Sequence, residues 1–352
     1  MNLKMRDTHR VEVLNPVKFE GWNEKITEHK GYTFFHTSHW AKLISETYGY
    51  TPVFQVIKEE NKITGILPLM EVKSLLTGKR GISLPFSDFS NPLVQNSDQF
   101  SDLLEATKEY GREAKWKYLE IKGAQDYLPA GTESYIEYEH IIDFDGNEEK
   151  LFSAFDSTTK RNIRKAIKEN VKVQRSQSFE TVAHFYKLNS LTRQRHGLPP
   201  QPYSFFRNLY NIIVKENLGT VFLAEHDGKV IAGAVYLHIG KRALYKYGAS
   251  DMKYQNLRAN NLVMWEAIKW YNSEGFEEFS FGKTEPDNEG LRRFKNGWSV
   301  RELESHTYRF DLQGDKFLKF STQTSGFHNK IFNRLPIPVL EVLGSFAYKH
   351  FA

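Results

Sequence analysis

Two stretches of this sequence repeat each other at an offset of 168 positions. A Val-Phe pair at 53–54, followed by KITGILPL from residue 62, matches a Val-Phe pair at 221–222, followed by VIAGAVYL from residue 230. Each copy is then followed by a helical pattern and a strand pattern. One matching hairpin arises easily by chance, but two spaced pieces followed by the same order of elements favour a duplication. We predict an internally duplicated α/β unit built on an antiparallel hairpin.

Periodicity and turn residues predict the other elements. Because the chain has 352 residues, 40% of them hydrophobic, it can bury two cores. We expect an α+β fold with mixed sheets and two domains, residues 1–134 and 135–315, followed by a tail, 316–352. The predicted strands are 11–14, 52–58, 62–72, 117–122, 135–144, 220–226, 229–239, 242–248, 279–281 and 301–312. The predicted helices are 39–50, 99–115, 147–155, 158–170, 179–195, 203–217 and 260–273.

The composition excludes several kinds of site. The sequence contains no cysteine, which excludes disulfides, thiolate metal sites and a cysteine nucleophile. The histidines lack the spacing of metal ligands, so no metal is expected. The start of the chain has no long apolar core, and no run is long enough to span a membrane, so we expect a cytoplasmic protein. The net charge of +5 suggests anionic partners such as phosphate, nucleic acid or a membrane surface, without singling one out. DNA is not among the partners that we expect.

The stretch 279–298, FSFGKTEPDNEGLRRFKNGW, predicts a short strand, a polar loop and a short basic helix that ends at Gly297. Unpaired N–H groups at a helix start suit an anionic ligand. Arg292, Arg293 and Lys295 add three cations. The alternative is a surface helix whose basic side chains are solvated.

A second basic segment follows the predicted domain boundary. At helical spacing Arg161, Arg164, Lys165 and Lys168 share one face. Because like charges repel and arginine forms paired bonds to phosphate, a phosphate or diphosphate is the expected ligand. The alternative is an exposed helix without a ligand.

Two smaller features could take part in chemistry. Strand alternation places Tyr245 and Tyr247 on one face, so both phenols are expected to point the same way; ordinary core tyrosines are the alternative. Asp88 lies among phenylalanines in a loop and could remove a proton from an amine, unless it only forms a turn with Ser90 or Asn91. No Walker A, GxGxxG, HExxH or GxSxG motif is present. Chemistry here would therefore rest on positioning, proton removal and electrostatic stabilisation.

Motifs along nearly the whole chain resemble the FemABX-type peptidyltransferases and their FemAB-like relatives, a duplicated form of the GNAT (acetyltransferase-like) superfamily. The most specific are F-x-F-G-K-T and L-R-R-F-K-N-G-W in the stretch 279–298. The others are a Ser38/Trp40 pair, LPFSDF, KRNIRKA, YKYGAS and NNLVMWEAIKW.

The resemblance implies two tandem GNAT-like domains, with the donor and the acceptor meeting in a cleft. There an amine attacks an activated acyl or aminoacyl ester, and an amide forms. It implies that Lys295 assists the transfer, that Asp88 takes the proton of the amine and that basic and tyrosine side chains hold a phosphate-linked acceptor. The expected catalytic residues are Lys295, Asp88 and Tyr247. The expected substrate-binding residues are Arg161, Arg164, Lys165, Tyr245, Trp40, Lys283 and Arg292.

The donor stays open at this point. The acyl-CoA signature of the superfamily is replaced by NLRANN at 256–261, although a pyrophosphate could still bind at Asn260 and Asn261, where a helix starts. No bound cofactor is expected; the donor is either aminoacyl-tRNA or an acyl thioester on CoA or acyl-carrier protein. The long helical hairpin of some family members is missing from the second half.

The tail, 316–352, is basic, aromatic and apolar. It is expected either to lie along the inner face of a membrane or to pack on the core. Similar tails occur in FemAB-like proteins of exopolysaccharide systems. The function expected is therefore N-acyl or aminoacyl transfer to an amino group of a phosphate-linked or lipid-linked envelope precursor, related to peptidoglycan or exopolysaccharide. The alternative is a non-catalytic protein of the same fold that binds a phosphate-bearing polymer or lipid.

Overall fold

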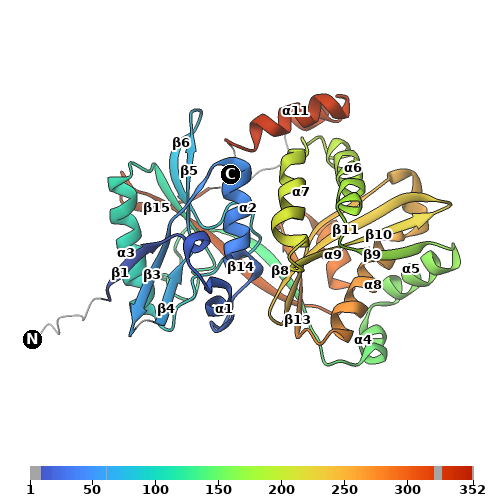
Figure 1. Cartoon of the computed structure of the whole chain (residues 1–352), viewed down its shortest axis with the longest axis horizontal. Coiled ribbons are helices and arrows are strands. Elements are labelled where there is room, and N and C mark those ends of the chain that lie inside the picture. The colour runs from blue at the N-terminus through green and yellow to red at the C-terminus, as the bar shows by residue number, and fades with distance from the viewer. Residues whose placement is uncertain (1–8, 61, 321–326, 351–352) are drawn as a thin grey trace, which may run out of the picture. The chain divides into compact units, whose positions relative to one another are not determined.

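The chain divides by its contacts into two compact units. The structure, a computed structural model, describes residues 9–60, 62–320 and 327–350, without the side chains of 327 and 328 (Figure 1). The first unit contains residues 9–136 and 305–320, and the second contains 137–304 and 327–350. The sequence grouped 135–315 in one domain. The contacts instead return 305–320 to the first unit, because Thr307–Asp311 pair there with Tyr118–Lys122.

The first unit contains two sheets. An antiparallel sheet has the order β1-β3-β4, and a mixed sheet has the order β2-β5-β6-β7-β14, with β15 paired to β14. The strands are β1 (Val11–Leu14), β2 (Thr51–Pro52), β3 (Phe54–Glu59), β4 (Lys62–Leu67), β5 (Met70–Ser74), β6 (Gly78–Ile82), β7 (Tyr118–Lys122), β14 (Arg301–Asp311) and β15 (Lys316–Leu318). The helices are α1 (Trp22–Thr27), α2 (Ser38–Tyr48) and α3 (Ser97–Glu113).

The single strand predicted over 62–72 is two strands in the structure. β4 pairs with β3, and β5 pairs with β6. Pro68 lies between β4 and β5 and cannot donate a backbone hydrogen bond, so the ladder is interrupted there.

The second unit has one mixed sheet between two layers of helices (Figure 1). Its strands follow the order β8-β13-β12-β11-β10-β9. Helix α6 packs on β10, β11 and β12, and α8 packs on the same strands with α5 beside it. The strands are β8 (Tyr135–Asp143), β9 (Lys172–Ser176), β10 (Gly219–His226), β11 (Lys229–Ile239), β12 (Arg242–Ser250) and β13 (Glu278–Thr284). The helices are α4 (Glu148–Ala154), α5 (Ser157–Lys168), α6 (Phe179–Arg195), α7 (Tyr203–Leu209), α8 (Ala259–Ser273), α9 (Glu289–Asn296), α10 (Phe327–Phe332) and α11 (Ile337–Ala347).

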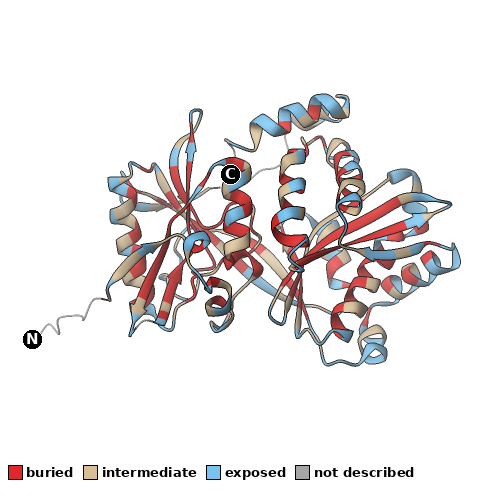
Figure 2. Cartoon of the chain, viewed as in Figure 1, coloured by how far each residue is buried: buried red, intermediate tan, exposed pale blue. Residues whose placement is uncertain are grey.

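Buried apolar side chains run along the central strands of each unit (Figure 2). In the second unit Trp265, Ile268 and Tyr271 of α8 pack against Phe222 and Tyr236 of the sheet. In the first unit the corresponding core is formed by α3 and β7 with β3 and β4. Each unit therefore has a hydrophobic core of its own.

The predicted duplication is visible in the strand order of both units. In each unit an antiparallel hairpin is followed by a strand that pairs in parallel with the next strand, reached through a long helix. This crossover is β6–α3–β7 in the first unit and β12–α8–β13 in the second. The sequence did not predict α1, β2, β6, β9, β15, α10 or α11, and the predicted helix 203–217 is α7 followed by a π-helical turn, Tyr210–Val214.

Gly81 on β6 is predicted to be essential for the stability of the first unit. A Cβ at this position would lie 2.0 Å from Cζ3 of the buried Trp116, whose indole N–H donates to Glu71 at 2.8 Å. Gly81→Ala should therefore lower the free energy of unfolding by about 1–3 kcal/mol, as measured by urea unfolding. Adding Trp116→Leu should recover part of that loss. An unchanged urea midpoint for Gly81→Ala would contradict this packing.

Candidate functional site

The two basic motifs of the second unit meet at Gly297. Helix α9 ends there, and the Gly297 carbonyl accepts a hydrogen bond from Asp156 N at 3.0 Å. Asp156 caps the start of α5 by accepting from Thr159 N. The rings of Phe155 and Trp298 pack edge to face, with centroids 5.1 Å apart. The end of the FKNGW segment therefore fixes the start of the basic helix.

Only a residue without a side chain fits at position 297. A Cβ on Gly297 would lie 2.6 Å from Thr159 Oγ1 and 2.8 Å from Asp156 Oδ2. Its φ of −64° is ordinary, so the requirement is the close approach of α5, and not a strained backbone.

Lys295 is buried within the second unit. Its side chain is 2% exposed, and Nζ donates to the carbonyl oxygens of Gly282 at 2.9 Å and Lys283 at 2.8 Å. Both acceptors lie near the end of β13, where a bulge interrupts its pairing with β8. The ammonium therefore fixes irregular backbone at the end of β13.

An ionic network lies beside this lysine. Arg292 donates two hydrogen bonds to Glu302, from Nε at 2.8 Å and from Nη2 at 2.5 Å, and its guanidinium lies 3.8 Å from the centroid of the Tyr138 ring. Nε2 of His140 lies 2.9 Å from Glu302. The alternative that Arg292 is merely solvated was wrong, because β8 and β14 supply an aromatic ring and a carboxylate to it. Arg293 is exposed.

The network lowers the pKa values of two of its groups, His140 and Glu302. Burial, together with the charge of Lys295, lowers the pKa of His140 to about 4, so the imidazole is neutral at pH 7. The hydrogen bonds from Arg292 lower the pKa of Glu302 to about 2. The result is a buried neutral histidine between a carboxylate and two cations.

Lys283, expected to bind substrate, forms an ion pair with Glu137, 2.7 Å between Nζ and Oε1. Glu137 is buried, and the nearby Ser280 donates to Glu139 at 3.1 Å. Sequence reasoning missed Glu137, His140 and Glu302. The available signal was the strand 135–143, YIEYEHIID, which carries more acidic groups than a core strand usually tolerates.

Tyr245 and Tyr247 do not share a face, so this prediction was wrong. A β-bulge shifts the register, so that Tyr236 pairs with Tyr245 and Val235 pairs with Tyr247. The extra residue, Lys246, reverses the alternation. Tyr245, which is partly buried, consequently packs on Tyr236 against the core next to α8.

Tyr247 instead packs against Phe205 and Phe206 of α7 on the other face, and its hydroxyl accepts from Gln201 Nε2 at 3.2 Å. Burial raises the pKa of Tyr245 to about 12, so that phenol stays protonated.

The parallel pairing of β12 with β13 ends at Leu244 and Ser280, before the bulged half of β12. The loop that follows β12 leads to the start of α8, where Arg258 takes a left-handed conformation, φ 59°. Asn260 is exposed and donates to Ser250 Oγ at 3.2 Å, whereas Asn261 is buried. The start of α8 therefore carries an exposed arginine and an exposed amide side chain.

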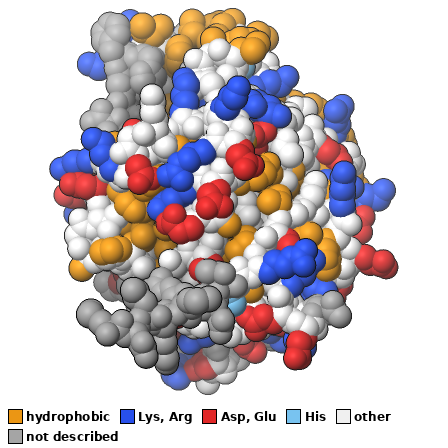
Figure 3. Space-filling model, turned by 90° about the vertical axis from the view of Figure 1, so that its left-hand side faces the viewer, with side chains coloured by type: hydrophobic (Ala, Val, Ile, Leu, Met, Phe, Trp, Pro, Cys, Tyr) orange, Lys and Arg blue, Asp and Glu red, His pale blue; other side chains and the backbone are white. Residues whose placement is uncertain are grey.

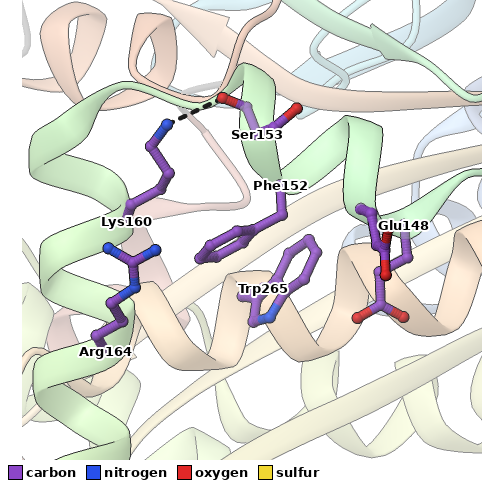
Figure 4. Close-up of a pocket in the computed structure, with 7 residues that line it drawn as sticks. Glu148, Phe152, Ser153, Lys160, Arg164 and Trp265 are labelled. Atoms are coloured by element: carbon purple, nitrogen blue, oxygen red, sulfur yellow. Dashed lines mark hydrogen bonds between the residues drawn. The ribbon is translucent and has the colours of Figure 1, made fainter.

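The basic face of α5 is exposed, and its first turns border a groove. The groove measures about 490 Å³ and lies between α4, α5 and α8 (Figure 4). Phe152 and Trp265 form its floor, with centroids 5.1 Å apart. Arg164 and Lys160 line one side, and Glu148 lies at the other end. Arg161, Lys165 and Lys168 are exposed on the same helix.

Two predicted site residues lie in the first unit. Trp40 is 0% exposed and packs against Phe35, so its burial argues against the substrate contact, which stays a prediction. Asp88 is half-buried in a loop braced by Ser83–Ser90 hydrogen bonds and by the buried Lys122, which donates to Ser87 O at 2.9 Å.

The backbone of this loop is strained. Leu84 and Phe86 take positive φ angles, 47° and 60°, and such strain in non-glycine residues is often found at functional sites.

In the part of the chain that the structure describes, no cluster of His, Asp and Glu side chains could hold a metal ion. None of the helices in residues 9–60, 62–320 and 327–350 is long and apolar enough to cross a membrane.

A family model and several curated proteins match part of the chain. Residues 153–296 match the family model of the acetyltransferase (GNAT) domain. The lipid II:glycine glycyltransferase of Staphylococcus haemolyticus (strain JCSC1435) is 22% identical over 230 residues, which cover 46% of this chain and 55% of that protein. The UDP-N-acetylmuramoylpentapeptide-lysine N(6)-alanyltransferase of Weissella viridescens is 24% identical over 144 residues, covering 40% and 42%. The matches span about half the length of these relatives.

The solved structures agree on the fold over more of the chain. The crystal structure of FemX superposes with a TM-score of 0.66 at 17% identity, covering 81% of this chain and 94% of that one. A tandem GNAT protein from the clavulanic acid biosynthesis pathway gives 0.53 at 10% identity, covering 86% and 98%. The fold is therefore GNAT-like, and the resemblance to the FemABX-type proteins is confirmed.

Gly297→Ala is predicted to separate α9 from α5, because the added methyl group would overlap Thr159 and Asp156. The expected loss is about 1–3 kcal/mol in the free energy of unfolding, measured with urea. Gly290 is a matched control on the same helix, since nothing lies within 4 Å of its Cβ position, and Gly290→Ala should be neutral or stabilising. Equal behaviour of the two variants would contradict the contact.

His140 predicts a pH dependence of stability. Its pKa in the folded chain, about 4, lies below the ordinary value of 6.5, so the unfolded chain binds the proton first as the pH falls. The contribution of His140 to the free energy of unfolding is therefore fully present above pH 6.5 and is lost as the pH falls toward 4. Between pH 7 and 5 the natural chain should lose on the order of 1–2 kcal/mol more than His140→Gln. Parallel urea titrations of the two proteins would show this, and an identical decline would refute it.

Proposed function

We propose that this chain is a FemAB-like N-acyltransferase that transfers an acyl or aminoacyl group to an amine of a cell-envelope precursor. The observation that carries the proposal is the buried Lys295, which holds the end of β13 within the matched GNAT domain. The similarity to a glycyltransferase and an alanyltransferase supports amide formation.

The reaction requires the lone pair of the amine to attack an ester or thioester carbonyl. A C–N bond forms, the C–O or C–S bond to the carrier breaks, and the amine proton leaves to a base while the leaving group gains one. We assign proton removal to Asp88, whose loop is strained and braced. We assign Lys295 to the transfer step, where its charge would stabilise the transition state and its hydrogen bonds would fix the Gly282 and Lys283 carbonyls.

Two groups of the expected residues lie at the starts or exposed faces of helices. Arg161, Arg164 and Lys165 lie on the exposed face of α5 and would bind the phosphates of the acceptor. Asn260 and Asn261, at the start of α8, would bind the donor.

The tyrosines and the paired cations have narrower roles. Tyr247, held between α7 and Gln201, would orient the substrate, whereas Tyr245, packed on Tyr236, and Arg292, paired with Glu302, would act through the contacts that they make within the unit. Lys283 has 35% of its side chain exposed despite its pair with Glu137, so it can reach a substrate.

The finer assignments concern donor, acceptor and location. Within the proposal the donor is an aminoacyl-tRNA or an acyl thioester on CoA or acyl-carrier protein, and the acceptor is nucleotide-linked or lipid-linked. Acyl-CoA enzymes of the superfamily carry a glycine-rich turn before this helix. Here Arg258 takes the left-handed conformation at that position, which supports the tRNA donor. A lipid-linked acceptor would place the protein at the inner face of the membrane.

A comparison of three variants of α9 tests the proposal. Lys295→Ala should lower the rate of amide formation about a hundredfold, because the end of β13 loses its fixed charge. Arg292→Ala, which releases Glu302, should cause a smaller loss. Arg293→Ala is the matched control, since this arginine is exposed on the same helix, and should stay within about twofold of the natural rate.

The rates are read by mass spectrometry of the acceptor, with urea unfolding to confirm that each variant is folded. Equal rates for the Lys295→Ala and Arg293→Ala variants would contradict the proposed role. A folded natural protein that binds precursors but never modifies them would indicate the non-catalytic alternative.

A further inference from the structure

Helix α11 packs tightly on the second unit through one narrow face. Leu340 is completely buried, and Gly344 approaches the loop before α7 so closely that a Cβ would lie 2.0 Å from the carbonyl oxygen of Pro200. The tail expected either to meet a membrane or to pack on the core therefore does pack, along the side that carries Leu340 and Gly344.

Glu341 of α11 and Tyr348, the residue after the helix, also face inward, whereas Ser345 is exposed. Glu341 accepts a hydrogen bond from Ser190 Oγ at 3.1 Å. Burial, with Glu341 beside it, raises the pKa of Tyr186. Just after the helix, the hydroxyl of Tyr348 accepts from Arg193 Nη2 at 2.9 Å. The two inward-facing polar groups are thus used in the contact with α6.

The outer face of α11 is apolar. Val339 is 45% exposed, Val342 69%, Leu343 38% and Phe346 63%. The spacing of these four residues, i, i+3, i+4 and i+7, places them on one stripe. Figure 3 shows hydrophobic side chains gathered at the upper edge of that view. The helix therefore differs from an ordinary surface helix, because its one carboxylate, Glu341, faces inward and an apolar stripe faces outward.

The exposed charged side chains of residues 327–350 have one sign. Lys330, Arg334 and Lys349 are exposed. The one carboxylate within residues 327–350 is Glu341, which faces inward. An apolar stripe in a segment whose exposed charges are all positive suits a surface with an apolar layer beneath anionic groups.

We propose that the outer face of α10–α11 docks this protein on an anionic lipid surface. A symmetric pairing with a second copy would bring the basic residues of one copy toward those of the other. Four side chains on an 11-residue helix also offer far less area than the roughly 800 Å² per partner of a stable protein interface. An anionic lipid surface would attract the basic residues, and it does not require the large contact area of a protein interface.

The docking deepens the proposed function, and rests on it in one respect: a transferase held on lipid would take a lipid-linked acceptor. Docking itself can be measured without any transfer. Its failure and the failure of the proposed function are therefore distinguishable.

The test is flotation of the full chain with two kinds of vesicle, phosphatidylcholine alone and phosphatidylcholine with phosphatidylglycerol. The natural chain should float with the anionic vesicles and much less with the neutral ones. Val342→Ser with Phe346→Ser should reduce binding at least about tenfold, because the apolar insertion is lost. Lys330→Glu with Arg334→Glu and Lys349→Glu should abolish the preference for anionic lipid.

The control replaces two exposed leucines elsewhere, Leu75→Ser with Leu76→Ser, in the turn between β5 and β6, where the side chains are 101% and 61% exposed. This variant should float like the natural chain. Equal loss in both serine variants would overturn the proposal, since binding would then reflect general stickiness. Light scattering adds a second outcome: a dimer that the Val342→Ser/Phe346→Ser variant loses, without flotation, would overturn it in favour of a second copy.

Discussion

The hydrogen bonds of the buried Lys295 ammonium hold together the part of the second unit on which its chemistry would depend. A buried charge is costly unless it is paired or hydrogen-bonded, and here two carbonyl oxygens at the irregular end of β13 accept from it. The same charge helps to keep His140 neutral. Because Gly297 follows two positions later and fixes the start of α5, the lysine also links the end of β13 to the basic helix.

The two units show how a repeated topology can carry different local chemistry. Both use a long helix to connect two parallel strands, but the buried lysine braces a loop in the first unit and the end of a strand in the second. Lys122 donates to the loop that contains Asp88, and Lys295 donates to β13. In each unit a desolvated ammonium stabilises backbone that regular pairing leaves free. The proposed base and the proposed transfer residue lie on these two braced segments.

The sequence predicts much of this fold, because most strands and helices carry strong periodicity and clear caps such as Asp156, Ser178 and Asn288. The repeated hairpins also reveal the duplication. The split at Pro68 was readable in principle, since proline interrupts a ladder. The positions of Tyr245 and Tyr247 were not, because a bulge depends on partner strands, and one extra residue reverses every later side chain. The pairing of Arg292 with Glu302, and the outward apolar stripe of α11, likewise depend on contacts between distant segments.

A donor screen tests the central claim most directly. The full chain is incubated with an amine-bearing envelope precursor and, in turn, with a charged tRNA pool, acyl-CoA or acylated acyl-carrier protein. The mass of the precursor is then measured by mass spectrometry. The account predicts that one donor adds an acyl or aminoacyl mass to the amine, as an amide that resists hydroxylamine. No mass increase with any of the three donors, from a folded chain that binds the precursor, would contradict it.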